Sequence, residues 1–328
     1  MPNLSLTLAC GAYDRTEALR NGVVQPEGID LTYLPIQSPP EIFARMIKHH
    51  AFDLAEMSSS IYLTRRARGD FPFLALPVFP SRLFRHGFIF VNTRAKIKTP
   101  KDLNGKRVGV PEYRQTAAVW IRGILKQEFA ASWEKMHWFE GGVDVPRRKD
   151  ELDYRPAGPV SLDFIPDGKT LGGMLESGEL DALIGARKPA CLGRSPHVQR
   201  LFPNYREVER EYYRKTGIFP IMHTLVVKES LYREKPWIAK SIYKAFVEAK
   251  ELCLTKARFT GTMRYTLPWL LADLEEMDEL FGPDPWPYGL EANRKTLETL
   301  IHFLVDQRFL EKPVTLEEMF TPITLVNE

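Results

Sequence analysis

The sequence predicts an α/β protein built from two lobes of similar plan. Its 328 residues exceed what one hydrophobic core comfortably holds, apolar strands alternate with helical segments, and one set of elements occurs twice in the same order. We assign residues 1–90 and 222–328 to the first lobe and residues 91–221 to the second, which is inserted into the first. A ligand cleft is expected between them.

The stretch that best shows this plan is residues 107–125. A short apolar strand, residues 107–110, is followed by a polar turn and by a helix with apolar residues at helical spacing. The turn contributes the candidate site residues Glu112, Tyr113, Gln115 and Thr116. The N-terminus of such a helix can bind an anion, because the N–H groups of its first turn are free and the positive end of the helix dipole lies there. An ordinary strand-to-helix turn without a ligand is the alternative.

The same order of elements opens the chain. A strand over residues 4–9 leads into a short helix through a turn containing Tyr13, which is a candidate substrate-binding residue. A strand over residues 31–35 matches one over residues 162–166. In both lobes a methionine precedes an aspartate by seven residues, Met46 with Asp53 and Met174 with Asp181. These matches predict two related βαβ lobes.

Further segments complete the predicted plan. Residues 82–92 and 217–227 are predicted as two apolar crossover strands, each carrying one histidine, and a helix is expected after the second. Residues 131–159 are rich in glycine, proline and charge, which predicts a surface excursion. Helical patterns over residues 267–280 and 292–305 are separated by a loop with three prolines and two glycines.

Composition excludes several classes of protein. The formal net charge is +3 with charges of both signs interspersed, so no basic face for nucleic acid is predicted. Cys10, Cys191 and Cys253 fit neither a disulfide framework nor a zinc knuckle, which favours a reducing compartment. No signal peptide or membrane span is recognisable. We therefore expect a cytoplasmic protein without membrane partners, with a homodimer as the default assembly.

Longer strings carry a family resemblance. They are Gly-Val-Pro-Glu-Tyr (109–113), Thr-Ala-Ala-Val-Trp-Ile-Arg-Gly (116–123), Arg-Lys-Pro (187–189), Thr-Gly-Ile-Phe-Pro-Ile-Met-His (216–223) and Pro-Tyr-Gly-Leu-Glu-Ala-Asn-Arg (287–294). In these the chain resembles the 4,5-dihydroxyphthalate decarboxylase family on a type II periplasmic-binding-protein-like fold. The resemblance implies non-oxidative removal of one carboxylate from a dihydroxylated aromatic dicarboxylate, which yields protocatechuate and CO2.

Such chemistry needs cations for the carboxylates, an acid for the ring carbon and a base for the para hydroxyl. The candidate cations are Arg82, Arg85, Arg187 and Lys188, because arginine offers two parallel donors to a carboxylate. Solvated cations or structural ion pairs are the alternative. Ser58 and Ser59 follow a predicted strand and either bind a carboxylate or cap the next helix.

The candidates for proton transfer are His86, His223 and Glu112. Histidine titrates near neutrality, and one lies in each crossover strand. A histidine satisfied inside the core is the alternative for each. Tyr113 is expected to stack on the ring or hydrogen-bond to it. We expect no metal and no other cofactor, because no metal-binding motif, Gly-x-Gly-x-x-Gly or Walker loop is present. A metal site assembled from distant residues would escape this test.

Two other classes of function compete with the enzyme. The fold also suits a solute-binding protein for an aromatic or other organic anion, which the lack of an export signal opposes. An effector-binding domain of a regulator is opposed by the lack of a DNA-reading helix pair before the first strand.

Overall fold

The computed structural model describes residues 2–149, 156–158 and 160–323. Within them the chain divides into two compact units. Unit 1 holds Met1–Arg82, Ile221–Leu297 and Val314–Glu328, and unit 2 holds Leu83–Pro220 and Glu298–Pro313. None of the described helices combines the length and apolarity that a bilayer crossing requires.

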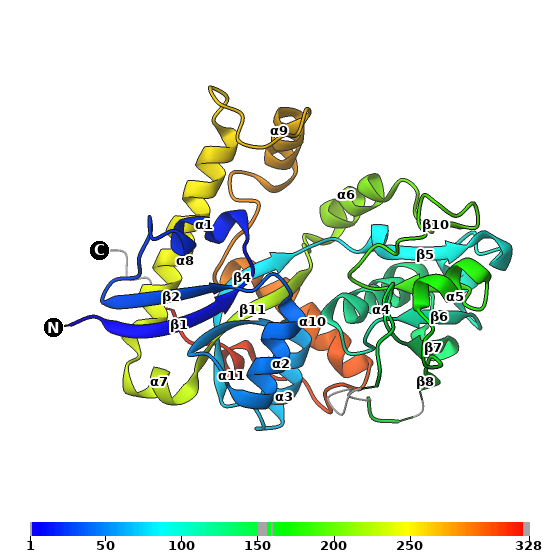
Figure 1. Ribbon diagram of the computed structural model, residues 1–328, viewed down its shortest axis with the longest axis horizontal. Helices are drawn as coiled ribbons and strands as arrows, with labels where there is room; N and C mark the ends of the chain where they lie inside the picture. Colours follow the sequence, from blue (N-terminus) through cyan, green and yellow to red (C-terminus); the bar gives the residue numbers. More distant parts are fainter. Residues whose placement is uncertain (1, 150–155, 159, 324–328) are drawn as a thin grey trace. The chain divides into compact units, whose positions relative to one another are not determined.

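Unit 1 is built on a mixed sheet whose described strands lie in the order β2-β1-β3-β11-β4 (Figure 1). β1 pairs in parallel with β2 and β3, and β11 runs antiparallel to β3 and β4. The elements are β1 (Leu4–Cys10), α1 (Glu17–Arg20), β2 (Ile29–Pro35), α2 (Pro39–His49), β3 (Leu54–Ser58), α3 (Ser59–Ala67), β4 (Phe73–Arg82), β11 (Ile221–Lys228), α7 (Glu229–Glu234), α8 (Trp237–Arg258), α9 (Leu270–Phe281) and α11 (Leu316–Met319).

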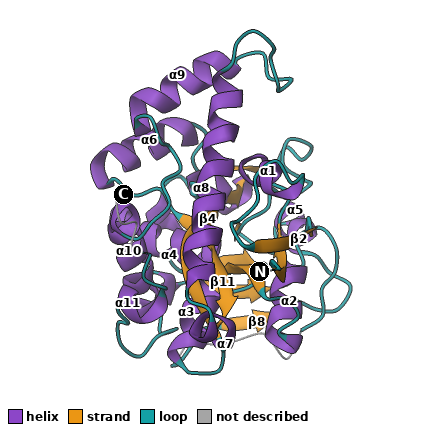
Figure 2. Ribbon diagram, turned by 90° about the vertical axis from the view of Figure 1, so that its left-hand side faces the viewer, coloured by secondary structure: helices purple, strands orange, loops and turns teal. Residues whose placement is uncertain are grey.

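Strand β3 is the buried centre of this sheet. All five of its residues are buried, as expected for a strand with neighbours on both sides. Helix α2 packs its apolar stripe of Ile42, Phe43, Met46 and Ile47 into the core. Figure 2 shows α8 alongside β4 and β11 and continuing beyond the sheet to α9.

Unit 2 has a second sheet, with its described strands in the order β10-β5-β9-β6-β7-β8. Its central strands are parallel, whereas β5 is antiparallel to β9 and β10. Its elements are β5 (Ile89–Asn92), β6 (Arg107–Val110), α4 (Thr116–Phe129), β7 (His137–Glu140), β8 (Leu162–Phe164), α5 (Leu171–Ser177), β9 (Ala182–Ile184), β10 (Val198–Arg200) and α6 (Tyr205–Thr216). Helix α10 (Arg294–Asp306) begins in unit 1 and continues in unit 2.

The predicted repeat is confirmed by one contact that both units share. In unit 1 the Asp53 carboxylate, just before β3, accepts hydrogen bonds from the Thr7 backbone N–H (2.9 Å) and hydroxyl (2.8 Å) on β1. In unit 2 Asp181, just before β9, accepts one from the Arg107 backbone N–H (2.9 Å) on β6. Each aspartate therefore joins its strand to the first strand of its βαβ set.

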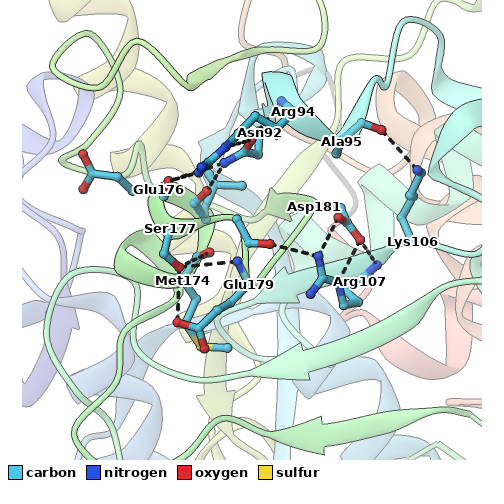
Figure 3. A network of polar contacts seen from close by, with 12 residues as sticks. Asn92, Arg94, Ala95, Lys106, Arg107, Met174, Glu176, Ser177, Glu179 and Asp181 are labelled. Atoms are coloured by element: carbon cyan, nitrogen blue, oxygen red, sulfur yellow. Dashed lines mark hydrogen bonds and ion pairs between the residues drawn. The ribbon is translucent and has the colours of Figure 1, made fainter.

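Figure 3 shows the surroundings of Asp181 in unit 2. Arg107 also donates from its side chain to Asp181 and to the Gly178 carbonyl, while Arg94 donates to the Glu176 carbonyl (2.8 Å) and Asn92 to the Leu175 carbonyl (2.7 Å). These donors satisfy the last carbonyls of α5 and its C-terminal turn, where a helix favours cations.

Two local predictions are wrong. Residues 82–92 do not form one strand, because β4 ends at Arg82, β5 starts at Ile89 and His86–Phe88 form a 3₁₀ turn. Gly87 explains the turn: a Cβ there would lie 2.7 Å from the Tyr205 ring, and its carbonyl accepts from Arg200 (3.0 Å). These partners are distant in sequence.

The excursion predicted for residues 131–159 contains β7, which pairs with β6 and buries Trp138. The sequence prediction matched residues 162–166 with β2. In the structure β7 is the counterpart of β2, because β7 pairs with β6 as β2 pairs with β1, and β8 pairs with β7 instead. Residues 150–155 and 159 of the predicted excursion lie outside the described residues.

The C-terminal segment is divided between the units. The sequence prediction assigned all of residues 222–328 to the first lobe, whereas Glu298–Pro313 belong to unit 2. Phe303 packs on α4, where a Cβ at Gly123 would lie 2.2 Å from its ring, and Gln307 accepts from the buried Arg122 (2.7 Å). The close approach of Gly123 and Phe303 holds this segment against α4.

Candidate active site

The site in unit 1 is centred on Glu56, the third residue of the buried strand β3. One oxygen, Oε1, accepts hydrogen bonds from the Tyr13 hydroxyl (2.5 Å) and from His223 Nδ1 (2.5 Å). The other, Oε2, accepts from the Gly11 backbone N–H (2.9 Å) and the Cys10 thiol (3.5 Å). The donors converge because β3 lies between β1, which ends at Cys10, and β11, which carries His223.

The Glu56 carboxylate is ionised in this setting. Burial by itself would raise the pKa of Glu56, but the charge of His223 and the hydrogen bonds from His223, Tyr13 and Gly11 together lower the pKa below its usual value. A buried carboxylate is stable only when such donors surround it. Glu56 therefore presents a fixed negative charge to the histidine.

His223 is placed by the sheet and held by this charge. It lies opposite Ser58 on β3 and Ser81 on β4, and the pairing of β11 with β4 shifts register on both sides of it. Such irregularities change the direction in which a side chain points. The His223 ring forms a T-shaped pair with the Phe43 ring, with the ring centres 5.1 Å apart, and 18% of the His223 side chain is exposed.

The orientation of His223 leaves one nitrogen for chemistry. Because Nδ1 donates to Glu56, Nε2 is the atom that can carry or take up a proton, and it has no hydrogen bond to the described residues. A carboxylate that orients one imidazole nitrogen and stabilises the imidazolium is a recurrent arrangement for acid–base catalysis. The pair can therefore deliver a proton from Nε2.

Tyr13, predicted to bind substrate, donates its hydroxyl to Glu56. Burial and the charge of Glu56 raise the pKa of the Tyr13 phenol, so it remains a donor. Arg15 holds the ring from the other side: its guanidinium carbon lies 4.3 Å from the centre of the Tyr13 ring and 4.2 Å from that of Trp286. Arg15 Nε also donates to the Pro80 carbonyl (2.9 Å). Arg15 is thus a positioning residue.

Replacing Arg15 with alanine should lower kcat about tenfold and leave KM nearly unchanged, since one cation–π contact and its hydrogen bond are together worth roughly 1–2 kcal/mol. Arg15→Lys should retain part of the rate, because an ammonium can still lie between the two rings. Steady-state kinetics measure both, and Arg20→Ala, an exposed arginine nearby, is the control. An unchanged kcat in Arg15→Ala would show that Tyr13 needs no such support.

The predicted serines lie where β3 passes into α3. Ser58 Oγ and Ser60 Oγ are 3.3 Å apart. The hydroxyl of Ser59, the first residue of α3, is buried with no hydrogen-bond partner among the described residues. Arg82, the last residue of β4, is buried and donates to the Pro287 carbonyl (2.7 Å) and to the Asn293 side chain. Carboxylate binding by these residues stays a prediction.

Unit 2 carries the other predicted substrate contacts. Arg187 and Lys188 are exposed and are the third and fourth residues after the end of β9. Gln115 precedes α4 and Thr116 is its buried first residue. The Glu112 carboxylate lies 3.9 Å from Arg114. Their catalytic and binding roles stay predictions.

Tyr113 is enclosed in the interior of unit 2. It is fully buried, the Arg122 guanidinium carbon lies 3.8 Å from the centre of its ring, and its backbone N–H donates to Glu140 (2.6 Å). The predicted contact of this ring with a substrate stays untested.

His86 and Arg85 lie inside unit 2. The His86 ring packs against Phe129, Phe202 and Tyr212, and neither ring nitrogen has a hydrogen-bond partner among the described residues. Its Nδ1 lies 3.9 Å from the Glu209 carboxylate. Burial lowers the pKa of His86 to about 4 and that of Arg85 to about 10. His86 is neutral at pH 7, and its role in proton transfer stays a prediction.

The buried His86 should make the protein sensitive to acid. Between its ordinary pKa of about 6.5 and about 4, the unfolded chain binds a proton that the folded chain does not, so stability falls as the pH falls through this window. In His86→Phe that loss is absent. The difference in free energy of unfolding, variant minus unsubstituted protein, should therefore be about 2 kcal/mol larger at pH 5 than at pH 7. The variant gains stability over the unsubstituted protein as the pH falls.

Urea unfolding at the two pH values measures this difference. Because Glu209 lies 3.9 Å from His86 and burial raises its pKa to about 7, both proteins are compared with Glu209→Gln in place, which removes the titration of this neighbouring carboxyl. A difference that does not vary with pH would show that His86 titrates alike in the folded and unfolded states.

Comparison with known proteins decides the family. No family model matches the chain. The 4,5-dihydroxyphthalate decarboxylase of Comamonas testosteroni is 36% identical over 326 residues, which cover 99% of this chain and 98% of the relative. The chain belongs to the 4,5-dihydroxyphthalate decarboxylase family. The resemblance recognised in the sequence is confirmed. The enzyme of the same name from Pseudomonas putida is 39% identical over 215 residues, 65% of this chain and 83% of the relative.

Solved structures show the fold of this family member. The periplasmic aliphatic sulphonate binding protein SsuA of Escherichia coli aligns over 98% of both chains with a TM-score of 0.55 and 12% identity. The alkanesulfonate-binding protein SsuA of Xanthomonas axonopodis aligns over 98% of this chain and 97% of its own, with a TM-score of 0.53 and 11% identity. The predicted periplasmic-binding-protein-like fold is confirmed.

Sequence reasoning missed Glu56, the centre of the site in this decarboxylase family member. A signal was present, because Glu56 is the acidic residue in the middle of the otherwise uncharged strand Leu-Ala-Glu-Met-Ser. A charge in a buried strand needs partners and is a functional-site candidate for that reason. Within the described residues, no group of three or more histidine, cysteine, aspartate or glutamate side chains is arranged to hold a metal ion.

Proposed function

We propose that this member of the family decarboxylates 4,5-dihydroxyphthalate to protocatechuate and CO2. The full-length similarity to an enzyme of that name supports the substrate. The observation that carries the mechanism is the His223–Glu56 pair, in which Nδ1 is bound to a buried carboxylate and Nε2 is left for the substrate. An aromatic dicarboxylate is thus the partner we propose.

Loss of CO2 from an aromatic ring requires a place for the electrons of the breaking C–C bond. Protonation of the ring carbon that bears the carboxylate provides it, because the hydroxyl para to that carbon stabilises the positive charge. The carboxylate then leaves as CO2, its bonding electrons restore the aromatic ring, and the added proton remains as the new C–H bond. The reaction consumes one proton for each CO2 released.

His223 supplies this proton in our proposal. Its imidazolium donates from Nε2 to the ring carbon, and the proton is then replaced from solvent through the exposed part of the side chain. Glu56 stabilises the imidazolium and keeps Nε2 in place. A positioned proton donor contributes about 10²- to 10⁴-fold to such a rate. Glu112 stays the proposed base for the para hydroxyl.

The start of α3 is the proposed seat for a carboxylate in unit 1. The N–H groups of its first turn and the positive end of its dipole attract an anion. The hydroxyl of Ser59, buried without a partner in the described residues, can donate to the same group. Ser58 lies opposite His223 on the neighbouring strand, which supports a carboxylate-binding site close to the proposed acid. Arg82, Arg85, Arg187 and Lys188 stay proposed carboxylate ligands.

The function is tested by mixing the purified protein with 4,5-dihydroxyphthalate and following CO2 and protocatechuate. We expect turnover, and tight binding without turnover would instead support the solute-binding alternative. The protein should also remain active after dialysis against a chelator, because the proposed acid needs no metal. Loss of activity that returns with an added metal ion would contradict the cofactor-independent mechanism. A cytoplasmic location remains our proposal, and cell fractionation tests it.

A further inference from the structure

Tyr33 is a half-buried side chain of unit 1 that the proposed function does not use. It lies on β2, the strand at the edge of the sheet beside β1. Its hydroxyl donates to the Gly11 carbonyl oxygen (2.6 Å) and lies 2.9 Å from the hydroxyl oxygen of Thr16. Burial raises the pKa of the Tyr33 phenol, and so do negative charges on Cys10 and Glu56, the ionisable groups that act on it. The phenol therefore stays protonated and able to donate.

The carbonyl that Tyr33 binds belongs to the turn that holds Glu56. The Gly11 backbone N–H donates to one oxygen of the Glu56 carboxylate (2.9 Å), and the Tyr13 hydroxyl donates to the other (2.5 Å). The Tyr13 backbone N–H in turn donates to the Gly11 carbonyl (3.0 Å), the same oxygen that accepts from Tyr33. The two donors to Glu56 are therefore joined through the Gly11 carbonyl, and Tyr33 binds the turn at that atom.

This turn is tightly packed, so a displacement at one residue moves the others. A Cβ at Gly11 would lie 2.8 Å from the Tyr13 ring, which shows how closely the two residues approach. Thr16 is fully buried, and its hydroxyl donates to the Tyr13 carbonyl (3.2 Å). Just beyond β2, the Ile36 backbone N–H donates to the Cys10 carbonyl at the end of β1 (3.2 Å). The end of β2 thus supports the turn through Tyr33 and its neighbours.

We propose that Tyr33 is a positioning residue for the decarboxylation. By binding the Gly11 carbonyl it keeps one donor on each oxygen of Glu56. The fixed carboxylate then holds His223 Nδ1, so that Nε2 remains the atom that carries the proton. A side chain that only stabilises the edge of the sheet is the alternative. The proposal rests on the proposed function of the His223–Glu56 pair, and one of its tests needs no turnover.

Tyr33→Phe removes only the hydroxyl and tests this role by steady-state kinetics. It should lower kcat about five- to tenfold, the size of effect that one hydrogen bond typically has, and leave KM for 4,5-dihydroxyphthalate nearly unchanged. Tyr232→Phe on α7 makes the same change at a hydroxyl that has no hydrogen bond to the described residues, and it is the matched control. An unchanged kcat in Tyr33→Phe would overturn the proposal.

A double-mutant cycle separates positioning from a purely structural role. In Glu56→Gln the carboxylate that Tyr33 is proposed to position is absent, so adding Tyr33→Phe should change kcat by less than about twofold. A side chain that only stabilises the sheet would instead give the same loss of kcat in both backgrounds, and that result would refute the positioning role. Single-turnover kinetics follow the slow variants.

Proton NMR distinguishes a failure of this proposal from a failure of the proposed function. The proton between His223 Nδ1 and Glu56 should give a far-downfield resonance, assigned by its absence in His223→Gln. In Tyr33→Phe this resonance should move upfield and exchange faster with solvent, whereas Tyr232→Phe should leave it in place. An unchanged resonance in Tyr33→Phe would overturn the positioning role even in a protein that decarboxylates its substrate. A shifted resonance in a protein without turnover would support the positioning role and refute the proposed function alone.

Discussion

Replacing His223 with alanine is expected to lower kcat by about 10²- to 10⁴-fold, the contribution of a positioned general acid. The variant still has the carboxylate seat proposed at α3, so KM for the diacid should change far less than kcat. His223 is partly exposed and its ring packs in a T-shaped pair with Phe43, so the sheet should tolerate the loss of this side chain. Protocatechuate formation under steady-state conditions measures the effect.

Two companion variants sharpen this result. His49→Ala removes an exposed histidine from the end of α2 in the same unit and should leave kcat unchanged. His223→Gln keeps a side chain that can donate to Glu56 but supplies no acidic proton, so it should be as slow as His223→Ala. A near-normal rate in either His223 variant would remove this residue from proton transfer.

Replacing Glu56 with glutamine should lower kcat about 10²-fold or more while leaving the shape of the side chain nearly unchanged. The neutral amide no longer stabilises the imidazolium of His223, and its NH2 group favours the wrong imidazole tautomer. The Gly11 N–H and the Tyr13 hydroxyl bind different oxygens of the Glu56 carboxylate, whereas the amide offers them a single acceptor oxygen. Single-turnover kinetics separate the slowed protonation step from substrate binding.

The same substitution has a signature in stability. Because the pKa of Glu56 is lower in the folded protein than in the unfolded chain, its ionisation stabilises the fold above its unfolded pKa of about 4.5, and this stabilisation is lost as the pH falls through the folded pKa. Glu56→Gln lacks this dependence, so the unsubstituted protein should lose more stability than the variant between pH 6 and pH 3. Parallel losses in urea unfolding would show that Glu56 is not held ionised.

Local sequence patterns predicted much of the fold for a physical reason. Apolar periodicity marks which face of a helix or strand is buried, and the repeated Met-to-Asp interval marked α2–β3 and α5–β9 as equivalent pairs. Patterns failed where short elements depend on distant partners. The four-residue strand β7 is defined by its pairing with β6, and the turn at Gly87 is defined by Tyr205 and Arg200.

The sequence by itself determined the family, the α/β class and His223 as a candidate acid, because long strings and apolar periodicity are properties of neighbouring residues. The tertiary structure alone decided which residues act together. Tyr13 and His223 lie 43 and 167 positions from Glu56, yet both bind the same carboxylate oxygen. It also separated the two histidines that looked equivalent in the chain, enclosing His86 among aromatic rings and leaving Nε2 of His223 without a hydrogen bond to the described residues. Burial and hydrogen bonding set the acid–base character of a side chain, and both are products of the fold.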